Sequence, residues 1–196
     1  MWPAIFLLTL AHVLSAQEAV PRFEPSQCPV PIPDNEKNVQ CGYAVVPENR
    51  TVKNNKTIRL PIIILKSLNS TPKPDPVLKT LGGPGASSLK MISGRRSSPW
   101  LSDRDYIIFE QRGTQFAQPA LSCPEVDKAR IASARAGFDR RTAKNSEVAA
   151  ARKCYERLRR SDIDLNAYNS AESAADIEDV RRVLKLDKIN LLRRFL

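Results

Sequence analysis

The sequence has 196 residues and a formal net charge of +10, from 31 Lys and Arg against 21 Asp and Glu, and only 6% of its residues are aromatic. Its length suits one domain of ordinary size after an N-terminal leader, and no later stretch approaches the ~20 apolar residues of a transmembrane helix. The basic residues occur as scattered pairs with few aromatics between them, so we interpret them as solvated helix faces and expect no nucleic-acid partner. A basic protein of this kind can still be attracted to an acidic envelope surface.

The first sixteen residues, Met1 to Ala16, predict a secretory signal peptide. Residues 5–10 form a short apolar core, and cleavage is expected near Ser15 or Ala16. No Lys or Arg precedes the core, and the alternative is an uncleaved N-terminal anchor. We therefore expect a secreted or extracytoplasmic protein, in the periplasm or the cell envelope, with no stable membrane span once the signal is removed.

Four cysteines follow the leader, and in an oxidising compartment we expect them to form disulfides. Four cysteines allow three connectivities, and locality in the chain favours two short loops over the other arrangements. A zinc site is the weaker alternative, because the sequence has no Cys-x-x-Cys spacing and no nearby His. The favoured pairs are Cys28–Cys41 and Cys123–Cys154.

The N-terminal part of the mature chain is predicted to enter the domain without regular structure. Residues 17–40 form an extended, Pro-rich segment. Strands are predicted at 42–47 and 57–66. Pro61 lies in the second of them and cannot donate to a ladder, so we expect a bulge there or a position near a sheet edge.

A glycine-rich turn follows the third predicted strand, Val77–Leu81. Gly82 and Gly83 lack a Cβ and permit a close backbone approach, and Pro84 fixes one dihedral angle. At the carboxyl end of a strand such a turn can direct N–H groups at a developing negative charge, so both glycines are candidates for an oxyanion loop. A phosphate loop is disfavoured because the Gly-x-x-x-x-Gly-Lys-Ser/Thr spacing is absent, and a plain strand-to-helix turn is the simplest alternative.

The remaining elements alternate between strands and helices. A short helix is predicted at 87–92, and 105–110 has the continuous apolar centre of a strand buried on both faces. From Cys123 to Arg160 the chain is predicted to be helical. One apolar face of that segment is expected to comprise Val148, Ala151, Tyr155 and Leu158.

The last helix is predicted to begin at Asn169, an N-cap, with Glu172 completing a capping-box-like pair. Acidic residues early in this helix and basic residues late in it complement the helix dipole. A fifth strand is predicted at 188–192. Strands interleaved with helices in this way imply a mostly parallel α/β sheet. The expected buried stripe of the helix is Ala174, Ile177, Val180 and Leu184.

Four groups of residues occur in a fixed order along the chain: Leu81-Gly82-Gly83-Pro84-Gly85 with Ser87-Ser88-Leu89, Phe109-Glu110-Gln111-Arg112-Gly113-Thr114, Pro119-Ala120-Leu121 with Cys123-Pro124-Glu125, and Tyr168-Asn169-Ser170-Ala171-Glu172-Ser173-Ala174-Ala175-Asp176-Ile177. This series resembles the first half of secreted α/β-hydrolases of the tripeptidyl aminopeptidase and proline iminopeptidase type, which are serine peptidases. The resemblance covers about residues 28–192. Leu81 and Glu110 stand where many relatives carry His and Asp.

The resemblance implies an α/β fold: residues 41–196 would be the N-terminal part of an α/β-hydrolase domain with about five strands in the order 1-2-4-3-5, truncated before the nucleophile elbow. The family uses a Ser in Gly-x-Ser-x-Gly after the fifth strand, an acid and a His. All three are expected beyond residue 196, so we assign no catalytic residue to this chain. Its single histidine, His12, lies in the leader. No cofactor or metal is implied.

Two functions from different classes follow. The chain can be a fragment of a secreted serine hydrolase, inactive alone, whose full-length relatives act on a peptide or a small amide or ester. Alternatively it is a complete, non-catalytic secreted binding module. A hydrolase using Lys or Asp chemistry at the glycine loop has no supporting constellation of residues.

Overall fold

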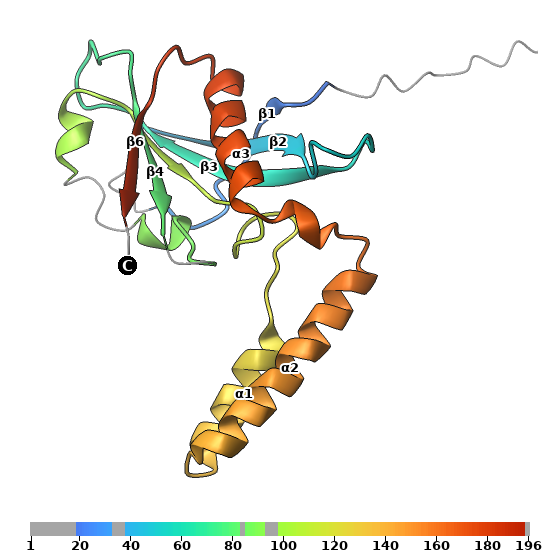
Figure 1. The fold of residues 1–196 in the computed structure, drawn as a ribbon. Helices are drawn as coiled ribbons and strands as arrows, with labels where there is room; N and C mark the ends of the chain where they lie inside the picture. Colours follow the sequence, from blue (N-terminus) through green and yellow to red (C-terminus); the bar gives the residue numbers. More distant parts are fainter. Residues whose placement is uncertain (1–18, 33–37, 83–84, 93–97, 195–196) are drawn as a thin grey trace, which may run out of the picture.

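A computed structural model describes residues 19–32, 38–82, 85–92 and 98–194. They form one six-stranded sheet in the order β1-β2-β3-β5-β4-β6, with helix α3 on one face and a hairpin of α1 and α2 projecting away from it (Figure 1). The predicted leader, residues 1–16, lies outside the described residues. The strands are β1 (Arg22–Pro25), β2 (Val39–Pro47), β3 (Thr57–Leu65), β4 (Val77–Leu81), β5 (Tyr106–Phe109) and β6 (Asn190–Arg194). The helices are α1 (Pro124–Arg135), α2 (Arg140–Arg160) and α3 (Ser170–Val183), with short 3-10 turns η1 (Leu89–Met91), η3 (Pro99–Ser102) and η4 (Leu165–Ala167).

The expected fold class, the N-terminal part of an α/β-hydrolase fold with a mostly parallel sheet, is wrong. The sheet is mixed, since β1–β2, β2–β3 and β3–β5 pair antiparallel and only β4–β5 and β4–β6 pair parallel. The antiparallel half arises because β2 and β3 are joined by residues 48–56, a connection too short for the crossover that a parallel pair needs. The relative order of the five predicted strands, and the parallel pairing of β4 with β5, are nevertheless as expected.

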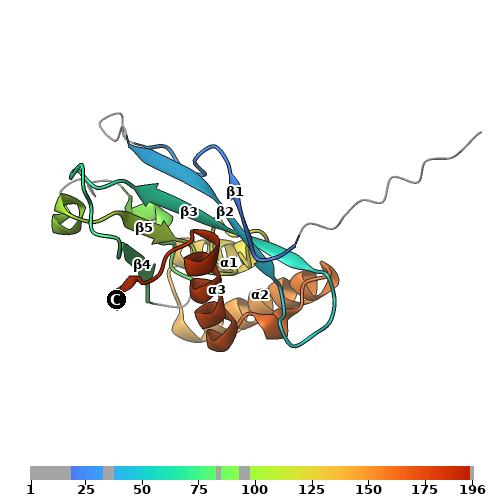
Figure 2. The ribbon, with the colours of Figure 1, turned by 90° about the horizontal axis from the view of Figure 1, so that it is seen from above.

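Two local expectations in the first half need correction. The segment 17–40 contains the strand β1, which pairs with β2 on the outer side of the sheet (Figure 2). Pro61 lies inside β3, an interior strand, just where the ladder with β5 ends at Ile62 and Phe109. Its carbonyl accepts the N–H of Glu110, so the missing N–H of Pro61 also faces the β5 side, at the end of that ladder and away from β2.

The core lies on both faces of the sheet because the central strands carry buried apolar side chains on both sides. Side chains of β2, β3, β4 and β5 alternate between the two faces, and α3 covers one of them with Val180. On the other face Leu89 of η1 and Leu101 of η3 pack against Ile63 and Ile108. The connections from β4 to β5 and from β5 to β6 thus run over opposite faces of the sheet.

The helical hairpin joins β5 to α3. Both disulfides favoured by locality are present, and Cys123–Cys154 closes the base of the hairpin. Asp139 caps α2 by accepting the N–H of Thr142 at 2.7 Å. The two disulfides indicate an oxidising, extracytoplasmic environment. Within the described part of the chain, no helix has both the length and the apolar character needed to cross a bilayer.

The predicted apolar face of α2 is only partly correct. Leu158 is buried, but Val148 and Tyr155 are about half exposed, and Ala151 is exposed. Helix α1 instead contacts a side of α2 made of small residues, which allow two helices to approach closely. The buried residues of α2 are Ala143, Ala150, Cys154 and Leu158.

Candidate functional site

A pocket of about 500 Å³ lies at the carboxyl ends of the three parallel strands. The strand order reverses at β4, because the chain places β5 on one side of it and then β6 on the other. Crevices outside such a switch point are the usual ligand sites of parallel sheets. The pocket is lined by Thr80, Leu81, Gly82 and Gly85, by Gln111, Arg112 and Thr114 after β5, by Leu191 of β6, and by Tyr168, Asn169, Ser170, Ser173, Ala174 and Ile177.

The glycine loop borders this pocket. Gly82 and Gly85 line it, and Gly85 has a φ of +85°, which favours glycine. Gly83, the second oxyanion candidate, lies outside the described residues. The segment after the loop forms η1, a short 3-10 turn, in place of the helix expected at 87–92.

Glu110 fixes the segment after the glycine loop against the end of β5. Its carboxylate is fully buried and accepts the hydroxyl of Ser87 at 3.1 Å and the N–H of Leu89 at 3.2 Å. Ser87 is therefore buried and hydrogen-bonded, which does not suit a nucleophile. The hydroxyl of Ser88 is buried beside it and has no hydrogen-bond partner among the described residues.

Gly113 allows the turn after β5 to pass beneath Tyr168. Its φ is +73°, and a Cβ at this position would lie 2.9 Å from Cδ1 of the Tyr168 ring. The Tyr168 hydroxyl donates to Glu48 at 3.4 Å. Burial, followed by the nearby charge of Glu48, raises the pKa of Tyr168, so the side chain remains a neutral phenol.

Beneath the pocket, Arg112 uses every N–H of its guanidinium. Nε and Nη2 donate to the two carboxylate oxygens of Asp176, each at 2.7 Å. Nη1 donates to the carbonyls of Glu48 and Ala167 at 2.6 and 2.7 Å, and Nη2 also donates to the carbonyl of Pro47 at 3.3 Å. Arg112 thereby ties the end of β5 to α3 and to the chain leaving β2.

Arg50 completes this cluster from the loop after β2. It is paired with Glu172, Asp176 and Asp179, all on the buried side of α3. Burial opposes the charge of Arg50, but hydrogen bonds to Asp179 and Asp176 raise its pKa above the usual value. We call Arg50, Arg112, Glu172, Asp176 and Asp179 the arginine–carboxylate cluster.

Sequence reasoning missed this cluster. Asn169 does cap α3, accepting the N–H of Glu172 at 3.0 Å, but the Glu172 carboxylate binds Arg50 rather than closing a capping box. In the expected buried stripe Val180 is fully buried, whereas Ala174 is exposed. The available signal was the spacing of Glu172, Asp176 and Asp179, which puts three carboxylates on one side of a helix.

The pocket can bind and polarise a group, but it lacks a nucleophile–base pair. Its described lining contains no His, Cys, Asp or Glu, and its hydroxyls come from Thr80, Thr114, Tyr168 and two serines of α3. No group of three or more potential metal ligands occurs among the residues that the structure describes. The Ser, acid and His expected beyond residue 196 stay a prediction.

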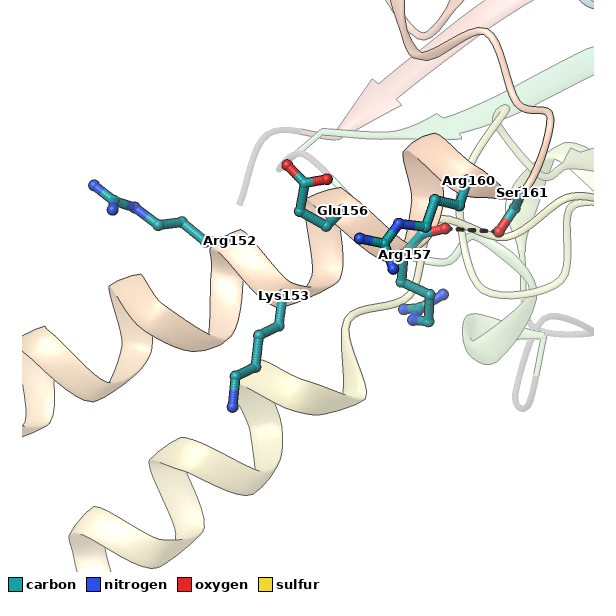
Figure 3. Close-up of a pocket in the computed structure, with 6 residues that line it drawn as sticks. All are labelled: Arg152, Lys153, Glu156, Arg157, Arg160 and Ser161. Atoms are coloured by element: carbon teal, nitrogen blue, oxygen red, sulfur yellow. Dashed lines mark hydrogen bonds between the residues drawn. The ribbon is translucent and has the colours of Figure 1, made fainter.

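A second, open hollow of about 620 Å³ lies along the C-terminal part of α2 (Figure 3). Arg157 in its wall is bound to Glu125 at 2.6 Å and to the carbonyl of Ser122 at 2.8 Å, which joins α2 to the start of α1. The lining has four cations and one carboxylate, and no catalytic pairing. It comprises Arg152, Lys153, Glu156, Arg157, Arg160 and Ser161.

Comparison with known proteins identifies no relative: no protein-family model and no curated protein sequence matches this chain.

Proposed function

We propose that this chain forms the oxyanion side of the active site of a secreted serine hydrolase, an aminopeptidase-type enzyme acting on peptide or amide bonds. The observation that carries the proposal is the position of Gly82, which lines a pocket at the carboxyl end of β4, where the strand order reverses. Backbone N–H groups at such a place can stabilise the negative charge of a tetrahedral intermediate.

The surroundings of the glycine loop support this role. The buried carboxylate of Glu110 accepts the N–H of Leu89 and the hydroxyl of Ser87, and so holds the segment that follows the loop. Anchoring of this segment favours donors that stay oriented during a reaction, which is the requirement for electrostatic stabilisation. The Ser88 hydroxyl, which is buried and has no hydrogen-bond partner among the described residues, is a further donor in this segment.

The remaining catalytic groups are assigned to residues outside this sequence. The only histidine is His12 in the predicted leader, so the mature chain has no imidazole to serve as general base. The chain alone is therefore expected to be inactive toward aminoacyl and tripeptidyl chromogenic amides. We place the protein outside the cytoplasm, as a secreted or cell-envelope protein.

The test uses the protein in its native source. An antibody against the α1–α2 hairpin captures it from the secreted fraction, and a fluorophosphonate probe labels any activated serine. Labelling of a species that yields peptides of this chain together with a Gly-x-Ser-x-Gly peptide supports the proposal. An unlabelled species with the mass of residues 17–196 contradicts it and favours the non-catalytic binding module.

A further inference from the structure

The surface of α2 that points away from α1 has no partner within the described protein. Ala150, Cys154 and Leu158 mark the side of α2 that is buried against α1 and the base of the hairpin. With a rise of 1.5 Å and 3.6 residues per turn, the opposite side is a straight stripe about 27 Å long. We call it the outer face of α2, and its residues, all exposed, are Arg141, Lys144, Val148, Arg152, Tyr155 and Arg159.

The outer face combines four cations with two apolar side chains. None of the four cations has an ion pair or a side-chain hydrogen bond among the residues described, whereas Arg130 and Arg157 elsewhere on the hairpin are paired with carboxylates. Val148 is 47% and Tyr155 52% exposed. The carboxylate of Glu156, four residues after Arg152 and three before Arg159, borders the face.

The hairpin presents this face without obstruction. It projects away from the sheet, and none of the described strands packs extensively on α1 or α2 (Figure 1). Figure 3 shows that Arg152 and the neighbouring Lys153 point to different sides of α2, so Lys153 lies off the outer face. A flat surface can therefore contact the whole stripe at once.

We propose that the outer face of α2 docks on the surface of an anionic phospholipid bilayer. Basic side chains at the edges of a helix bind acidic headgroups, while Val148 and Tyr155 between them enter the headgroup–acyl boundary. Tyrosine suits that boundary because its ring is apolar and its hydroxyl is polar. A soluble polyanion satisfies the cations but leaves both apolar side chains in water, and for this reason the bilayer is the occupant that fits.

The proposal is tested by co-sedimentation of the oxidised, secreted chain with vesicles of phosphatidylcholine, with and without phosphatidylglycerol. We expect binding only to the anionic vesicles. Each basic residue near an anionic surface contributes about fivefold to affinity, so Arg152→Gln/Arg159→Gln is expected to weaken binding about 25-fold. The variant Val148→Ser/Tyr155→Ser is expected to weaken it on the order of tenfold without changing charge.

The matched control is Lys153→Gln/Arg160→Gln. This variant removes the same charge from neighbouring positions of α2 that lie off the outer face. It is expected to weaken binding less than about threefold at physiological salt, because exposed charges are screened there. Equal weakening by the two charge variants overturns the proposal, as does equal binding to neutral vesicles or none to anionic ones. A third result also overturns the proposal. If Val148→Ser/Tyr155→Ser weakens neither binding to anionic vesicles nor binding to soluble polyphosphate, the outer face is a polyanion site.

Discussion

Replacement of Arg112 by leucine is expected to destabilise the protein more than any other single surface or loop substitution. The side chain is 1% exposed and Asp176 is 0% exposed, so Arg112→Leu leaves a buried carboxylate with Arg50 as its remaining cation. Removing one partner of a buried ion pair lowers the free energy of unfolding by about 3–5 kcal/mol. Because Arg50 Nη2 still lies 2.9 Å from Asp176, we expect the lower end, about 3 kcal/mol.

Urea unfolding of the oxidised protein, followed by far-ultraviolet circular dichroism, measures this loss. The control is Arg182→Leu, which removes an exposed i,i+4 pair with Glu178 and is expected to change the free energy of unfolding by less than about 0.5 kcal/mol. The double variant Arg112→Leu/Asp176→Leu removes both charges and is expected to be more stable than Arg112→Leu alone. An Arg112→Leu protein within about 1 kcal/mol of the parent, or a double variant that is simply additive, refutes the reasoning.

Three further predictions concern separate parts of the fold. Cys28→Ala/Cys41→Ala is expected to lower the free energy of unfolding by about 3 kcal/mol, since the disulfide closes a loop with a sequence separation of 13; urea unfolding without reductant checks this, and a loss under about 1 kcal/mol contradicts it. Hydrogen bonds from Arg181 lower the pKa of Glu178 to about 2, so the contribution of Glu178 to stability is complete above pH 4.5 and is lost as pH falls toward 2. The difference in melting temperature between the parent and Glu178→Gln is therefore expected to shrink between pH 4.5 and pH 2. A difference that stays constant with pH contradicts this prediction. Leu191 is 55% exposed on the edge strand β6, and Leu191→Lys is expected to reduce self-association measured by sedimentation velocity; an unchanged distribution shows that this edge does not mediate association.

The positions of the strands were predictable from local apolar residues, whereas their order was expected from the resemblance. The stretch 105–110 has a continuous apolar centre and 77–81 has apolar residues at three of its five positions, and the two strands pair as expected. The direction of pairing was not recognised for β2 and β3, because an apolar run has the same pattern in a parallel and an antiparallel strand. The short connection 48–56 was the stronger indicator, because a loop of this length joins antiparallel strands.

The arginine–carboxylate cluster was not predictable in the same way. Arg50 lies more than a hundred residues from Glu172 in the sequence, and nothing local distinguishes it from the solvated arginines of α2. The acidic side of α3 was interpreted as a match for the helix dipole, which is a local effect. Ion pairs with Arg50 and Arg112 instead direct the acidic side of α3 toward the end of the sheet.

Closure of the hairpin at its base also determines how it would behave under proteolysis. The turn between α1 and α2 exposes Arg135, Arg140 and Arg141, so a trypsin-like protease in the same extracytoplasmic environment can cleave there. Cys123 and Cys154 lie on opposite sides of that cut and remain covalently joined. A nicked molecule would therefore migrate as one chain until it is reduced.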